Sequence, residues 1–303
     1  MKEGAGRVAG IIRKGRLQDV RPLYMWLGVF CLIIGIILLS INLYGLTQHI
    51  RKPGLGVSDH EQLRFIPDEV WSYQESMTAI DQLGRIDDRN QLAETANNVV
   101  NQSLVHVDWK RVDPQEYRQL VPIWENYFLW AIGQFSGLPQ FERYHYADYR
   151  RNIRRGIGIC GDASTILSSV MDRYDVPNRI ISFRGHVIVE YQDESGDHYL
   201  MDPDFGVSLD TSLKGLLRDP ESFKHRYLSA GYSEGEIDYL FEAYAKGYSI
   251  FEDTYHFMTL RYWFEEVSYL AKWLMPILMI VLSGIYLLWP RRPIDNGRIR
   301  SNE

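Results

Sequence analysis

The sequence predicts an α+β domain held between two transmembrane helices, and three patterns in the 303-residue chain lead to this class. Two apolar stretches, 23–46 and 268–289, are long enough to cross a bilayer, which takes about 20 helical residues. Between them, apolar residues recur at helical spacing, most clearly over 88–105. Further along the chain, short runs rich in Ile, Val and Tyr alternate with polar turns, which is typical of an antiparallel sheet.

The first apolar stretch, 23–46, holds 24 residues without a charged side chain. A cleaved signal peptide has a shorter apolar run, and no small-residue cleavage motif follows at Thr47, so we interpret this stretch as a retained anchor. The second stretch carries Lys272 near its start, where the amine can reach the lipid headgroups, and Trp273 and Trp289 near its ends. Both stretches are therefore expected to span a membrane.

Charge is distributed unevenly along the chain. Residues 1–52 hold eight Lys and Arg against two acidic residues, residues 268–303 hold five against two, and residues 53–267 carry a net charge of −15. Because basic flanks stay on the cytoplasmic side, we expect both termini in the cytoplasm and the middle of the chain outside the plasma (inner) membrane, in a periplasmic or other extracytoplasmic space. The acidic middle is unsuited to nucleic acid, so the lipid bilayer is the partner that the sequence indicates directly.

These boundaries divide the chain into segments. We expect, besides the two spans, a cytoplasmic N-terminus (1–22), a Pro- and Gly-rich linker (47–67), an extracytoplasmic domain (68–267) with its core at 155–206, and a cytoplasmic tail (290–303).

Within the domain, three further stretches carry expectations. A second amphipathic helix should begin after Asp113 and run to Ile132. Residues 137–155, rich in Tyr and Arg, form either one side of a cleft or a solvated basic loop. The aromatic stretch 248–267 should continue as a helix into the second span.

Cys160 is the only cysteine outside the first span, which contains Cys31, so we expect no disulfide. It follows the glycines at 156 and 158 and directly precedes a helix predicted over 163–174. Backbone amides at a helix start carry a partial positive charge, which favours thiolate over thiol. A buried cysteine acting as a small apolar residue is the alternative.

Two strand-like runs downstream each carry one more reactive side chain. His186 opens the run 186–191, and Asp202 closes the run that follows the polar turn 193–197. Placing His186 opposite Asp202 centres that turn on Glu194, so we expect the imidazole to meet the carboxylate. The alternatives are a surface histidine and a turn-opening aspartate before proline. We expect no role for Asp204, two residues further on.

These motifs resemble the core of the transglutaminase-like superfamily of papain-like cysteine enzymes, in its membrane-anchored bacterial form. The matching pieces are Gly158-Ile159-Cys160 before a helix, His186 leading a strand that ends in Val189-Glu190, and Met201-Asp202-Pro203. The resemblance implies a papain/transglutaminase-like core, in which the helix bearing the cysteine packs on an antiparallel sheet, with added helices. It implies a catalytic triad of Cys160, His186 and Asp202 that performs acyl transfer or hydrolysis at an amide or ester. It also implies cell-envelope peptides, proteins or polysaccharide assemblies as substrates.

Other functions find less support in the sequence. Gly156, Gly158 and Gly161 match a dinucleotide-binding fingerprint, but the preceding segment is basic where a buried strand is needed. No cysteine or histidine spacing is typical of a metal site, so we expect neither a metal nor a cofactor. A non-catalytic, membrane-anchored binding or scaffold module of the same fold, in envelope or exopolysaccharide assembly, is the alternative to an enzyme. Its weakness is that a scaffold needs no intact set of Cys, His and Asp.

Overall fold

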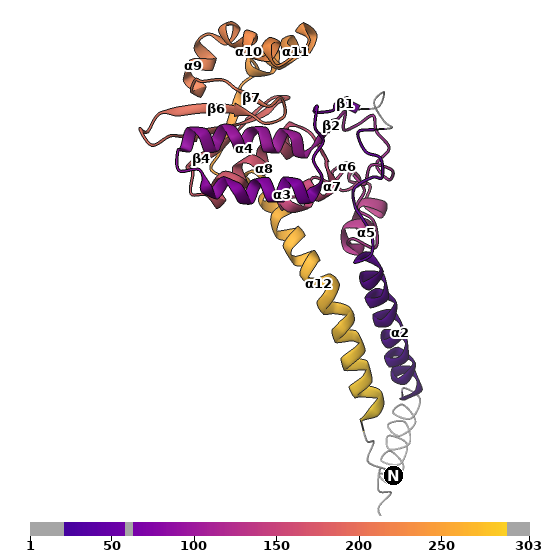
Figure 1. Cartoon of the computed structure of the whole chain (residues 1–303). Helices are drawn as coiled ribbons and strands as arrows, with labels where there is room; N and C mark the ends of the chain where they lie inside the picture. Colours follow the sequence, from indigo (N-terminus) through magenta and orange to yellow (C-terminus); the bar gives the residue numbers. More distant parts are fainter. Residues whose placement is uncertain (1–20, 58–62, 290–303) are drawn as a thin grey trace, which may run out of the picture. The chain divides into compact units, whose positions relative to one another are not determined.

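The computed structural model describes residues 21–57 and 63–289, which form an α+β structure (Figure 1). The chain divides into two compact units. We call Met1–Thr47 with Leu270–Glu303 the anchor unit, and Gln48–Tyr269 the main unit. Each unit is described by itself below.

The anchor unit is built from two apolar helices. Both α2 (Arg21–Gly45) and α12 (Thr254–Leu288) are long and apolar enough to cross a membrane, and α12 enters this unit with its C-terminal part. The helices approach closely at Gly35, where an added Cβ would lie 3.0 Å from the carbonyl oxygen of Pro276. Small residues allow such contacts between apolar helices. The predicted cytoplasmic residues 1–20 and 290–303 lie outside the described part of the chain.

The main unit is a mixed sequence of helices and short strands. In chain order they are β1 (Leu63–Phe65), α3 (Tyr73–Gln82), η1 (Leu83–Arg85), α4 (Arg89–Ser103), β2 (Val105–Val107), α5 (Tyr127–Phe135), α6 (Pro139–Glu142), α7 (Tyr149–Arg155), β3 (Ile157–Gly158), α8 (Cys160–Arg173), β4 (Asn178–Phe183), β5 (Val187–Gln192), β6 (His198–Asp202), β7 (Val207–Ser208), α9 (Leu213–Arg218), η2 (Pro220–Phe223), α10 (Lys224–Ser229), α11 (Glu234–Tyr244), β8 (Tyr248–Phe251) and the start of α12.

A five-stranded antiparallel sheet, in the order β7-β6-β5-β4-β8, forms the centre of the main unit. Helices α3, α4 and α8 pack on one face, in a buried cluster that includes Val189. Helices α9, α10 and α11 pack on the other face, in a cluster that includes Ile188 (Figure 1). Neighbouring residues of β5 therefore point to opposite faces, as the predicted alternation over 186–191 requires.

A smaller sheet, β1-β2-β3, leads into the start of α8. Strand β2 pairs antiparallel with β1 and parallel with β3, and β3 is followed within two residues by Cys160. Strands β1 and β2 each carry a charged or titratable side chain, Arg64 on the outer strand β1 and His106 on the central strand β2. This sheet therefore brings two residues from early in the chain to the helix start.

The helix predicted over 88–105 is confirmed as α4, with Asp88 accepting a hydrogen bond from the N–H of Gln91 as its cap. The helix predicted to begin after Asp113 is wrong in its start, because α5 begins only at Tyr127. Asn126 caps that helix through its side-chain oxygen, and the preceding stretch consists of turns, with Arg118 in the left-handed region at φ 57°.

Three other stretches also differ from expectation. Residues 137–155 are not a solvated loop: they form α6 and α7, and Tyr144, Tyr146 and Arg155 are buried. The predicted linker, 47–67, contributes to the main unit, because Ile50 and Leu55 are buried there and 63–65 form β1, while residues 58–62 lie outside the described part of the chain. The stretch 248–267 begins with a strand, β8, that pairs with β4 before the helix starts. In each case tertiary packing decides a segment that lacks a clear local pattern.

Candidate active site

Cys160 is the first residue of α8, and local sequence explains why the helix starts there. Gly156 ends α7 in the left-handed conformation, with φ 75°. Gly158 has no room for a side chain, because a Cβ there would lie 2.9 Å from the Cβ of Asp162. Asp162 in turn accepts a hydrogen bond from the backbone N–H of Ile159 at 3.1 Å and caps the helix. The thiol is thus held, partly exposed, at a helix N-terminus.

His186 lies just before β5, after Gly185, whose φ of 120° favours glycine. Its Nε2 donates to Oδ2 of Asp202, the last residue of β6, at 2.7 Å, and both side chains are buried. The structure therefore brings together the histidine and the aspartate that the sequence singled out. Nδ1 is left as the ring nitrogen available to Cys160.

The strand register differs from the predicted one. The prediction puts His186 directly opposite Asp202, whereas β5 and β6 pair Val189 with Met201, which is two residues out of that register. The paired strands centre the turn on Ser195, the middle of the run 193–197, which is one residue later than the predicted centre at Glu194. A shift of two residues keeps every side chain on its face, so the imidazole still meets the carboxylate, across a diagonal.

Two helices on the far side of the sheet hold the Asp202 carboxylate. Tyr227 of α10 donates its hydroxyl to Oδ2 at 3.0 Å, and the backbone N–H of Phe205 donates to Oδ1 at 3.3 Å. The hydroxyl of Tyr244, from α11, lies 2.8 Å from that of Tyr227. Burial, and then the charge of Asp202, raise the pKa of both tyrosines well above the ordinary value, so both stay protonated. Nothing in the sequence pattern marks either tyrosine.

The surroundings of His186 favour the protonated imidazole. Burial by itself lowers the pKa of an imidazole, but the charge and hydrogen bond of Asp202, together with the neighbouring Cys160, raise the pKa of His186 well above its ordinary value. The site therefore favours an imidazolium beside the thiol.

Asp204 was expected to have no role, but the structure places it beside His186 and Cys160. Its side chain is buried, and one of its oxygens, a ring nitrogen of His186 and Sγ of Cys160 all lie within 4.8 Å of one another. The carboxylate binds Nδ1 of His106 at 2.6 Å and accepts from Nη2 of Arg64 at 2.8 Å. Burial by itself raises the pKa of Asp204, but Arg64 and His106 hold it well below the usual range.

Arg64 gives the site a fixed positive charge. Burial lowers the pKa of its guanidinium, but the charge of Asp204 and smaller contributions from other acidic groups of the site together raise the pKa above the ordinary value. The guanidinium lies over the ring of Phe205 at 5.2 Å, and the edge of the same ring meets His186, with ring centroids 5.5 Å apart. Sequence reasoning missed Arg64 and His106 because they lie far from Cys160 in the chain, on a sheet that no pattern predicts.

Behind the helix start, a hydrogen bond from His145 fixes Asp162. Nδ1 of His145 lies 2.9 Å from Oδ2 of Asp162, and the ring of Trp109 stacks on that imidazole at 4.3 Å. Burial raises the pKa of Asp162, but His145 and then Arg155 lower it below its ordinary value. His145 and Arg155 belong to the stretch 137–155, which was expected to form either one side of a cleft or a solvated loop. This stretch therefore holds the Asp162 carboxylate that caps α8.

The arrangement allows two kinds of chemistry. Cys160, His186 and Asp204 present a thiol sulfur, an imidazole nitrogen and a carboxylate oxygen, which are the donor types that hold a metal such as zinc. The same thiol and imidazole, with Asp202 behind the ring, also have the order of a nucleophile, its base and the group that orients the base.

Comparison of the chain with models of known protein families, with curated proteins and with solved structures found no match. The geometry of the site is therefore the basis of the functional argument that follows.

Proposed function

We propose that the main unit is a membrane-anchored cysteine enzyme with a papain/transglutaminase-like core, which catalyses acyl transfer or hydrolysis at an amide or ester. The strongest support is the placement of His186, whose Nε2 is held by Asp202 at 2.7 Å while Sγ of Cys160 lies within 4.8 Å of a ring nitrogen. A buried carboxylate behind the imidazole fixes its tautomer and stabilises its cation.

In the first half of the reaction, Sγ of Cys160 attacks the carbonyl carbon and forms a tetrahedral intermediate. The intermediate collapses to a thioester as the C–N or C–O bond breaks, and His186 gives its proton to the leaving amine or alcohol. In the second half, water or an amine attacks the thioester, His186 takes its proton, and the thiolate leaves. Asp202 keeps its charge throughout and orients the ring.

The negative charge that develops on the carbonyl oxygen needs donors in a water-poor site. The backbone N–H of Cys160, at the start of α8, is one such donor. Arg64 supplies a positive charge from the other side of the cluster, held there by Asp204 and His106. We assign Arg64 to the stabilisation of this charge, and Asp204 and His106 to the positioning of Arg64.

The setting of the enzyme follows from the spans and from charge. Two apolar helices suit a lipid bilayer, and the basic ends with an acidic middle favour cytoplasmic termini and a catalytic domain on the periplasmic or other extracytoplasmic side of the plasma membrane. Peptide, protein or glycan-linked components of the cell envelope are the substrates within reach there.

Two other functions remain to be separated from this one. A scaffold module of the same fold in envelope or exopolysaccharide assembly would use the surface of the main unit and not the thiol. A metal site is favoured by one observation, the mutual distance of at most 4.8 Å among donors from Cys160, His186 and Asp204. Added Co²⁺ would then give a thiolate charge-transfer band that disappears in Cys160→Ser.

Labelling with an amide- or ester-mimicking electrophile, on intact cells and on purified full-length protein, tests the enzyme proposal. We expect one adduct on Cys160, formed far more slowly in His186→Ala. Labelling of Cys160 at equal rates in both proteins would leave the scaffold function, and labelling that requires prior chelation of metal would favour the metal site. Cys31→Ser is the matched control, because that residue lies in α2 and has no role in the chemistry.

A further inference from the structure

A second surface of the main unit lies at the turn between α5 and α6. The sequence between Glu125 and Glu142 contains no charged residue. At the turn, Phe135 is 74% exposed and Leu138 is 44% exposed. Exposed apolar side chains in a contiguous uncharged segment mark a surface that meets another apolar phase.

The turn is a built feature of the fold. Gly137 reverses the chain with a left-handed φ of 68°, and Pro139 starts α6 at a position where its missing N–H costs nothing. Gly133 lets the two helices approach, because a Cβ there would lie 2.6 Å from the carbonyl oxygen of Phe141. Close packing of α5 against α6 fixes the turn between them and leaves Phe135 exposed.

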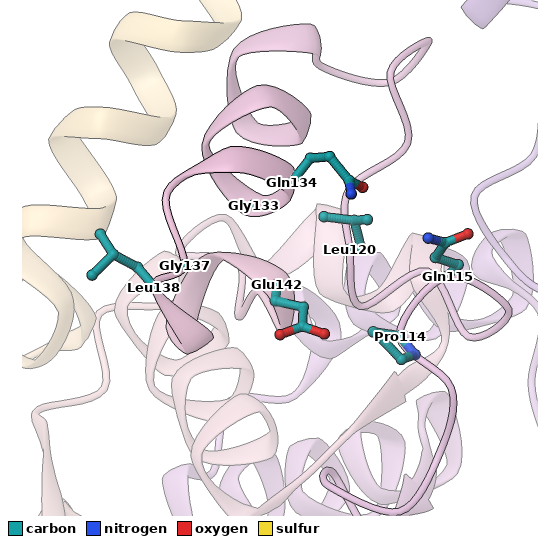
Figure 2. Close-up of a pocket in the computed structure, with 8 residues that line it drawn as sticks. All are labelled: Pro114, Gln115, Leu120, Gly133, Gln134, Gly137, Leu138 and Glu142. Carbon is teal, nitrogen blue, oxygen red and sulfur yellow. The ribbon is translucent and has the colours of Figure 1, made fainter.

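The two sides of the turn differ in polarity. Its inner side borders a cavity of about 270 Å³, where Gln115, Gln134 and Glu142 surround Leu120 (Figure 2). Leu138 also borders this cavity, but Figure 2 shows its side chain pointing away from Gln115, Gln134 and Glu142. A polar inner side and an apolar outer side are the pattern of a segment that lies in a membrane interface.

Within the main unit, helix α5 packs against residues close to both points where the chain passes into the anchor unit. Leu129 of α5 belongs to a buried cluster with Ile50, and Tyr269 packs against the same cluster. Ile50 follows the last residue of α2 by five residues, a reach of at most about 17 Å, and Tyr269 is the last residue of the main unit. Within the main unit, α5 therefore packs close to both places where the chain passes into the anchor unit, at Gln48 and at Tyr269.

We propose that the α5–α6 turn inserts into the lipid headgroup region of the bilayer that the two apolar helices enter, as a third membrane contact of the chain. Phe135 and Leu138 reach the acyl boundary, and Trp130 of α5 suits the interface, where aromatic rings concentrate. This contact restrains the main unit against the membrane surface, and it does not depend on the proposed catalytic function.

Lipid-quenching measurements on the full-length chain test the contact. In a Cys31→Ser, Cys160→Ser background, single cysteines replace Phe135 or Leu138, carry a polarity-sensitive fluorophore, and are reconstituted in phosphatidylcholine vesicles with or without quencher-bearing lipid. The matched control is Leu228→Cys, because Leu228 is 48% exposed on α10 beside Lys224 and Arg226.

We expect both turn labels to be quenched by lipid several-fold more strongly than the control label, and to be shielded from aqueous iodide. Lipid quenching no stronger than the control, with full access to iodide, would show a water-facing turn and overturn the proposal. Shielding from both quenchers would also overturn it, because a protein partner or a second copy of the chain would then cover the turn.

Discussion

Replacing Asp204 with asparagine perturbs the cluster that holds Arg64 in place. The buried carboxylate binds His106 at 2.6 Å and Arg64 at 2.8 Å, and asparagine keeps its shape but loses its charge. Removing one partner of a fully buried ion pair costs about 3–5 kcal/mol, and the cost here lies at the lower end, about 3 kcal/mol, because the Arg64 side chain is 27% exposed. We expect the free energy of unfolding of the main unit to fall by about this amount at neutral pH.

The pH dependence of this loss has a definite sign. Although burial opposes it, Arg64 and His106 hold the pKa of Asp204 well below the usual range. A group with a depressed native pKa contributes stability above its unfolded pKa of about 3.9, and that contribution is lost as the pH falls through the native value. The difference between wild type and Asp204→Asn should therefore be full at neutral pH and shrink in acid.

Urea unfolding of the full-length protein in mild detergent, followed by the protease resistance of the main unit, measures both quantities. Asp197→Asn is the control, because Asp197 is an exposed residue of the β5–β6 turn, and such a change alters stability by about 0.5 kcal/mol or less. If Asp204→Asn proves as mild as the control, or its cost grows in acid, the reasoning about the buried cluster is refuted.

Three more predictions address other parts of the chain. Asp202→Asn should lower the pKa of His186, since it removes the charge that raises that pKa. Histidine NMR across a pH series measures this pKa, and a ring that titrates as in wild type would contradict the prediction. Gly133→Ala should destabilise the main unit by about 1–3 kcal/mol through overpacking, because the added methyl would lie 2.5 Å from a leucine side chain; an unchanged urea midpoint contradicts this. An impermeant thiol reagent on intact cells should reach Cys160 but not Cys31, and protection of Cys160 until lysis would reverse the orientation.

The local features of the core were predictable from sequence because each rests on a short pattern. Glycines before Cys160, the alternation around His186 and the polar hairpin turn place three residues on a helix start and two strand ends. The register was wrong by two residues, because pairing His186 with Asp202 centres the turn on Glu194. The middle of the polar run 193–197 is Ser195, which is the centre that the paired strands have.

The second half of the site was not predictable, for a physical reason. Arg64, His106 and Tyr227 reach the cluster through a small sheet and a helix whose positions depend on long-range packing. Asp204 is different, since its two-residue spacing from Asp202 was visible. The sequence nevertheless offered no reason to include Asp204 in the site, because its burial beside Arg64 depends on the same long-range packing.

The central claim is that Cys160 forms an acyl-enzyme with the help of His186, and pre-steady-state reaction with p-nitrophenyl acetate tests it most directly. The purified full-length protein should release close to one equivalent of p-nitrophenolate in a burst, with the acetyl group mapped to Cys160 by mass spectrometry. Cys160→Ser and His186→Ala should show no burst. A burst of equal rate in His186→Ala, or acetyl groups on lysines with none on Cys160, would contradict the account.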